Sequence, residues 1–127
     1  MDLTPLVPAG RQIIESYGDG RFRVSGTLFA SSILVFADRT IVWPVVDFAA
    51  LTETSLEPLH RAGEAGLVDV VLLGCGARMG VVPEVLRRHL RVAGIVVEPM
   101  DTGAACRTYN VLAAEGRRVA AALIAVD

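Results

Sequence analysis

Hydrophobic and polar positions change their periodicity partway along the chain. In the first part, short runs rich in β-branched and aromatic residues are separated by turn residues, as in Gln12–Tyr17, Gly18–Gly20 and Phe22–Ser25. Because the middle segment consists of residues that tolerate positive φ, the pattern predicts a β-hairpin. Ser32–Phe36 and Thr40–Trp43 predict a second antiparallel pair. The first third of the chain is therefore predicted to be antiparallel β-structure.

Two residues set limits on these strands. Gly26 predicts a bulge or a second turn after the first hairpin. Pro44 cannot donate a hydrogen bond to a ladder, so the strand before it either ends there or lies at a sheet edge. The hairpins are expected either to extend a central sheet or to lie beside it.

From about residue 53, helical and strand patterns alternate. Thr54 or Ser55 can cap a first helix, which Gly66 ends. Val68–Leu73 is almost entirely apolar and rich in β-branched residues, as in a central strand that is covered on both faces. Pro83 suits the first turn of a second helix.

The same alternation continues to the end of the sequence. Gly94 ends the second helix, and Ile95–Val97 begins the next buried strand. A third helix is predicted over Thr102–Glu115, and a final apolar strand over Val119–Val126. Helices between buried strands imply right-handed crossovers and a largely parallel central sheet. The sequence thus predicts an α/β fold with N-terminal antiparallel hairpins, and 127 residues suit one domain, 1–127.

Composition narrows the expected location and partners. The longest apolar run, Val119–Val126, is far shorter than the roughly 20 residues that cross a bilayer, so no transmembrane segment is expected. Met1–Pro5 has neither a basic region nor a long apolar stretch, so we expect no secretory or mitochondrial leader and a cytoplasmic location. A net charge of −2 and a pI of about 5.6 argue against nucleic acid as a partner.

Residues able to carry out chemistry are few and scattered. All 12 basic residues are arginines, which excludes lysine-dependent chemistry such as Schiff-base formation. Cys75 and Cys106 are far apart in the sequence, and His60 and His89 are equally isolated, each in a position expected to be solvated. Because a metal site needs a cluster of such ligands, the sequence predicts no metal site, and we expect no cofactor.

Two loops form the candidate site, because ligands of open α/β sheets bind outside the carboxyl ends of parallel strands. The loops are Gly74–Gly80 and Pro99–Gly103, which adjacent crossovers would place side by side. The candidate ligand-binding residues in and after these loops are Gly74, Cys75, Gly76, Arg78, Asp101, Thr102, Cys106 and Arg107. The first loop is either an anion cradle with Arg78 as a charged contact, or a sharp turn with Arg78 paired to a carboxylate.

The same residues also have structural interpretations. Asp101 or Thr102 can cap the third helix, and Asp101 can pair with an arginine nearby; capping is favoured over anion binding. Either cysteine can be a nucleophile or a small buried hydrophobe, and no histidine is expected at this end of the sheet to act as a base. Trp43 with Phe48 is either an exposed aromatic patch or packed beneath a loop.

A family resemblance is centred on the C-terminal block. The matching segments are Met100–Leu112, Glu115–Leu123, Ile14–Gly18, Phe22–Gly26, Trp43–Pro44 and Leu73–Gly76. Together they resemble the Mth-like family of unknown function, which includes the mitochondrial complex I assembly factor three and an adipogenesis-associated protein. The resemblance covers nearly the whole chain and implies a three-layer α/β fold with a mixed central sheet.

The resemblance implies a non-enzymatic protein, and the mitochondrial members point to assembly through protein contacts. The first hypothesis is therefore a protein-interaction or assembly-type factor with no catalytic residues. The alternative is a small-molecule or anion-binding enzyme or sensor that uses the strand-end pocket. A third possibility is a homo-oligomer formed through an edge strand of the N-terminal hairpins.

Overall fold

The computed structural model describes residues 10–127, and this part of the chain contains eight strands, three α-helices and two short 3₁₀ helices. The strands are β1 (Ile14–Gly18), β2 (Arg21–Val24), β3 (Thr27–Phe29), β4 (Ile33–Val35), β5 (Thr40–Val42), β6 (Val70–Gly74), β7 (Val96–Met100) and β8 (Val119–Leu123). The helices are η1 (Phe48–Ala50), η2 (Thr54–Leu56), α1 (Glu57–Glu64), α2 (Glu84–Val92) and α3 (Thr102–Ala114). The expectations about Met1–Pro5 lie outside the described residues.

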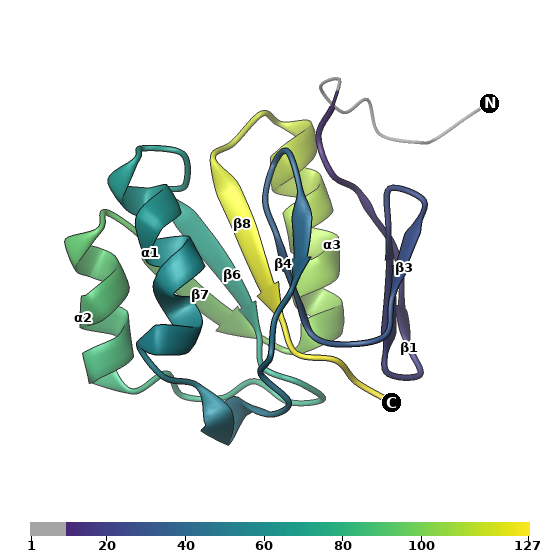
Figure 1. Ribbon diagram of the computed structural model, residues 1–127, viewed down its shortest axis with the longest axis horizontal. Helices are drawn as coiled ribbons and strands as arrows, with labels where there is room; N and C mark the ends of the chain where they lie inside the picture. The colour runs from purple at the N-terminus through teal and green to yellow at the C-terminus, as the bar shows by residue number, and fades with distance from the viewer. Residues whose placement is uncertain (1–9) are drawn as a thin grey trace.

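The strands form two sheets (Figure 1). β1, β2 and β3 make a three-stranded antiparallel sheet, and the other five make a mixed sheet in the order β5-β4-β8-β6-β7. β6 pairs in parallel with β7 and β8, whereas β4 pairs antiparallel with β8 and β5. The mixed sheet that the family resemblance implies is confirmed, whereas the largely parallel sheet that the residue pattern predicts is parallel only across β8, β6 and β7. Of the two expected hairpins, the second extends the central sheet and the first lies beside it.

Helices cover the central sheet on both faces. α2 connects β6 to its outer neighbour β7, whereas α3 connects β7 back across β6 to β8. Right-handed crossovers that run in opposite directions across a sheet leave their helices on opposite faces. Figure 1 shows α1 and α2 on one face and α3 on the other, with the three-stranded sheet packed beside α3.

Alternate residues of the central strands contribute to two separate cores. In β6, Val71 and Leu73 pack toward α1 and α2, whereas Leu72 packs toward α3. β8 alternates in the same way, and all of its residues are buried. This is the two-sided burial that the apolar run Val68–Leu73 predicts, although the strand itself begins at Val70.

The helix ends largely follow the predicted signals. Gly94 and Gly116 come after α2 and α3 with φ of +82° and +76°, the left-handed conformation that glycine adopts most readily. The predicted cap of the first helix is wrong. Thr54 and Ser55 belong to the 3₁₀ turn η2, and Ser55 N donates to Oγ1 of Thr52, just before that turn, at 3.1 Å.

The segment that follows β5 leaves the central sheet and packs into the core on the side of α1 and α2. β5 ends at Val42 and is an edge strand, so both interpretations of Pro44 are confirmed. Trp43 is buried, and its Nε1 donates to Ser55 O at 2.8 Å. Trp43 therefore packs beneath a loop, and the exposed aromatic patch is excluded. Within residues 10–127, no helix has both the length and the apolar character needed to cross a membrane.

Candidate functional site

The loops that follow β6 and β7 lie side by side at the carboxyl ends of these strands, as predicted. Cys75 N donates to Met100 O at 2.8 Å, and Thr102 N donates to Gly76 O at 2.9 Å. The Thr102 hydroxyl accepts from Gly76 N at 3.0 Å and donates to Ile124 O at 2.7 Å. The Gly76 amide, which an anion cradle would use, is therefore already engaged within the protein.

Close packing fills the space around these loops. A Cβ on Gly74 would lie 3.0 Å from Thr102 Cα and 3.1 Å from Leu123 Cδ2. A Cβ on Gly80 would lie 2.7 Å from the ring of Phe48. These two glycines allow close approach of neighbouring segments, which is the structural interpretation of the loop.

The charged residues of the candidate site do not pair with one another. Asp101 Oδ1 accepts from Ala104 N at 2.9 Å and caps α3, the role that the sequence favours. Arg107 Nη1 donates to the Tyr17 hydroxyl at 3.2 Å, across to β1. Arg78 is exposed, and in the described part of the chain none of the ion pairs includes Asp101, Arg78 or Arg107.

The two cysteines lie on opposite faces of the central sheet. Cys75 packs in the core under α1 and α2, and Cys106 packs in the core beside α3. Burial raises the pKa of both thiols, that of Cys106 to about 12. Because the thiolate is the nucleophilic form, burial disfavours nucleophilic chemistry at both side chains. The predicted cluster is thus divided between buried and exposed positions, and its role in ligand binding stays a prediction.

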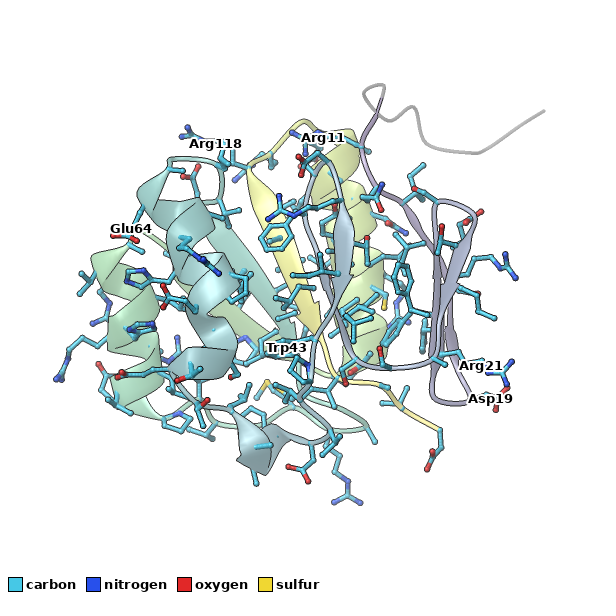
Figure 2. All side chains as sticks on the ribbon, viewed as in Figure 1. Arg11, Asp19, Arg21, Trp43, Glu64 and Arg118 are labelled. Atoms are coloured by element: carbon cyan, nitrogen blue, oxygen red, sulfur yellow. The ribbon has the colours of Figure 1, made fainter. Side chains whose placement is uncertain are left out.

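A groove of about 780 Å³ lies near the amino ends of β6 and β8, opposite the loops that follow β6 and β7. It is formed between the β4–β5 turn and α1. Its floor is apolar and includes Phe36, Ile41 and Val68. The charged residues that line it are Arg11, Arg39, Arg61, Arg118 and Asp38. Figure 2 shows Arg11 and Arg118 along this edge of the molecule, with Arg21 at the far end. Four of these five charged residues are arginines, and Arg39 pairs with Asp38 at 3.6 Å.

Contacts within the protein hold three of these guanidinium groups in place. Arg11 donates to a backbone carbonyl at 2.9 Å, and Arg118 pairs with Asp69 at 2.9 Å. Arg39 stacks on the phenyl ring of the floor, 4.7 Å from its centroid. Within residues 10–127, no ion pair engages Arg61. Guanidinium groups above an apolar floor suit a ligand that carries both carboxylates and apolar groups.

The two histidines, predicted to be isolated and solvated, lie together between α1 and α2, so this prediction is wrong. Their ring centroids are 4.4 Å apart with 26° between the ring planes, and both side chains are half-buried. His60 Nδ1 lies 3.1 Å from Glu64 Oε1. The pair forms because α1 and α2 pack on the same face of the sheet.

Sequence reasoning missed both the groove and the histidine pair. The groove is lined by residues from four separate segments of the chain, and no local sequence pattern predicts it. The histidines did carry a signal. His60 is four residues after Leu56, and His89 is three residues after Leu86, so each imidazole lies on the inward stripe of its helix. That spacing predicts contact with the neighbouring helix.

The fold defines a three-layer α/β protein in which a mixed sheet lies between a pair of helices and a helix with a small second sheet. A family model described as "Protein of unknown function (DUF498/DUF598)" matches residues 14–124. The chain belongs to this family.

Sequence relatives agree with this assignment. An uncharacterized protein of Rhodobacter capsulatus is 40% identical over 116 residues, which cover 91% of this chain and 86% of that protein. Human NADH dehydrogenase (ubiquinone) 1 alpha subcomplex assembly factor 3 is 31% identical over 117 residues. The match covers 87% of this chain but only 59% of the human protein.

Solved structures share the fold. The crystal structure of an outer membrane protein from Bartonella henselae has a TM-score of 0.86 and 34% identity, covering 93% of this chain and 98% of that one. The solution NMR structure of a Bordetella pertussis protein, described as a Mth938-like domain, has a TM-score of 0.83 and 30% identity, covering 98% and 92%. The Mth-like family resemblance and fold are confirmed.

Proposed function

We propose that this protein is a non-enzymatic interaction factor that binds an acidic, partly apolar segment of another protein in the arginine-lined groove. The observation that carries this proposal is the combination of four arginines with an apolar floor in one groove of about 780 Å³. A protein segment that alternates carboxylate and apolar side chains matches both features.

The chemistry of the groove favours such a segment. Guanidinium groups bind carboxylates with two parallel hydrogen bonds, which fixes orientation as well as charge. Leu67, at the margin of the groove, is 64% exposed and offers apolar surface to a partner. A buried contact of this kind excludes water from the charge pairs around it, which strengthens them.

The names of the mitochondrial relatives support a protein partner. Those relatives are called assembly factors, and they share about a third of their aligned residues with this chain. Because this chain spans 59% of the human protein, the proposal takes from that name only the class of function.

Ligand binding at the strand-end loops has less support. The Gly76 amide and the Thr102 hydroxyl, which would bind an anion there, are hydrogen-bonded to each other. The cytoplasmic location expected from the sequence stays a prediction, which cell fractionation would test. The third possibility, a homo-oligomer, would be tested by light scattering of the purified protein.

The proposal is tested by recovery of partners from native extract. Wild-type protein is compared with a groove variant, Arg39→Glu with Arg61→Glu, and with a control of equal charge change, Arg21→Glu with Arg23→Glu on the exposed side of β2. Quantitative mass spectrometry measures each captured protein. We expect a stoichiometric partner whose recovery falls by about tenfold or more in the groove variant and is unchanged in the control.

Two outcomes count against the proposal. One is equal recovery of every protein by the wild type and the groove variant. The other is that the folded wild type recovers no stoichiometric partner across growth conditions.

A further inference from the structure

We infer that Glu57, His60 and His89 form a binding site for a zinc ion between α1 and α2. One potential ligand atom from each of the three residues lies within 4.8 Å of the other two. Glu57 and His60 are three residues apart on α1, which puts them on one face of that helix, and His89 comes from the last turn of α2. The inference is independent of the groove and of the proposed function.

One ring nitrogen of His89 is buried and free to bind a ligand. Its Nε2 atom is buried and has no hydrogen-bond partner in the described part of the protein. Buried polar nitrogens are nearly always paired, because an unpaired one loses its bonds to water and gains none in return. A metal ion bound to the lone pair of this nitrogen would satisfy it.

His60 has the support that metal-binding histidines commonly have. Its Nδ1 lies 3.1 Å from Glu64 Oε1, four residues further along α1. A carboxylate bonded to one ring nitrogen fixes the orientation of the imidazole and makes the other nitrogen a better ligand. Figure 2 shows Glu64 at the end of α1 on the side of α2, so this support lies beside the proposed site.

The donor set favours zinc over calcium and magnesium. Two imidazole nitrogens and one carboxylate oxygen are ligands typical of zinc, whereas calcium and magnesium prefer oxygen ligands alone. Ligand atoms around tetrahedral zinc are about 3.4 Å apart, given Zn–N distances of about 2.0–2.1 Å. Zinc binding therefore requires the three ligand atoms to move closer by about 1.4 Å at most and the two stacked imidazole rings to turn so that their lone pairs converge. Three protein ligands leave a fourth position for water.

Cysteine does not contribute to the site. Cys75 and Cys106 are buried in the two cores, and neither belongs to the ligand cluster. The site is therefore expected to bind zinc without thiolates, through neutral imidazoles and one carboxylate.

Isothermal titration of untagged protein with ZnCl₂ tests the inference directly. We expect one zinc ion per chain in the wild type, and a Tm that rises by about 10 °C when free zinc exceeds its Kd a hundredfold. Co²⁺ in place of zinc should give the visible absorption of a four-coordinate complex. His60→Ala and His89→Ala should each lower the zinc affinity by about 100-fold or more, and Glu64→Gln by about 10-fold.

Arg88→Gln is the matched control, because Arg88 neighbours His89 on α2 and is exposed. It should bind zinc like the wild type. If a histidine variant does not fold, Glu57→Gln provides the test, and circular dichroism without zinc monitors the fold of every variant. The inference is overturned if the folded wild type binds no zinc, or if removing any of the three ligands leaves the affinity unchanged.

Discussion

At the level of single residues, burial controls the chemistry of the predicted site. Cys106 and Tyr109 face the core beside α3, with exposed fractions of 3% and 0%. Burial raises the pKa of each side chain to about 12, since the charged form loses its hydration. The neighbouring Arg107 lowers the pKa of Cys106 by a smaller amount, so proximity to an arginine does not create a reactive thiolate here.

This difference predicts how stability responds to alkaline pH. The pKa of Cys106 is higher in the folded protein than its ordinary value of 9.0, so the folded state retains the proton that the unfolded state releases. The free energy of unfolding should hold below about pH 9 and then fall with rising pH, by at most about 1.4 kcal/mol per pH unit from this group. Urea unfolding between about pH 8 and about pH 11 measures it.

Cys106→Ala should flatten the decline between about pH 9 and about pH 10. Tyr109 contributes a similar decline only above its ordinary pKa of 10.0, whereas Cys75, whose pKa burial also raises, contributes in the same window, so Cys106→Ala removes only the part due to Cys106. Equal slopes for the wild type and Cys106→Ala in that window would show that the thiol is not held protonated by burial.

At the level of elements, local sequence patterns predicted those strands and turns that are determined by neighbouring residues. Turn residues marked the first hairpin, and the apolar run of β6 predicted its two-sided burial. β3 was missed because Thr27–Phe29 is short and lacks a buried residue, so it has no alternating pattern. The position of β8 between β4 and β6 was also missed, because strand order depends on packing between distant segments.

Gly63 shows how packing between elements overrides local preference. A Cβ at this position would lie 2.6 Å from Ile95 Cδ1 and 2.7 Å from the carbonyl oxygen of Ala93. Helix propensity alone favours alanine over glycine in α1 by about 1 kcal/mol. Crowding against a backbone atom costs about 1–3 kcal/mol.

We therefore predict that Gly63→Ala destabilises the protein, by up to about 2 kcal/mol after the gain in helix propensity is subtracted. Urea unfolding measures the change, with Val92→Ala, an exposed position on the neighbouring α2, as a control expected to stay within about 0.5 kcal/mol. A more stable Gly63→Ala protein would mean that α1 can move away from the α2–β7 turn without loss.

At the level of the whole molecule, both new sites depend on the assembled fold. The loops predicted from β6 and β7 were brought together as expected, because the carboxyl ends of adjacent parallel strands meet at one edge. The arginine-lined groove lies at the opposite ends of these strands. It is lined by side chains from the turn after β4, from α1 and from the segment before β8. The spacing of residues in the sequence does not predict which distant side chains lie together, so the groove is recognised only in the folded structure.

The proposed function places the protein partner in the arginine-lined groove. Amide signals of nitrogen-15-labelled protein, recorded by NMR with and without the partner captured from native extract, locate the contact residue by residue. We expect the largest changes in Phe36–Arg39 and Ala62–Val68, which line the groove. Changes concentrated instead in Gly76–Gly80 and Asp101–Arg107, with the groove signals unmoved, would contradict the account and place the contact at the strand-end loops.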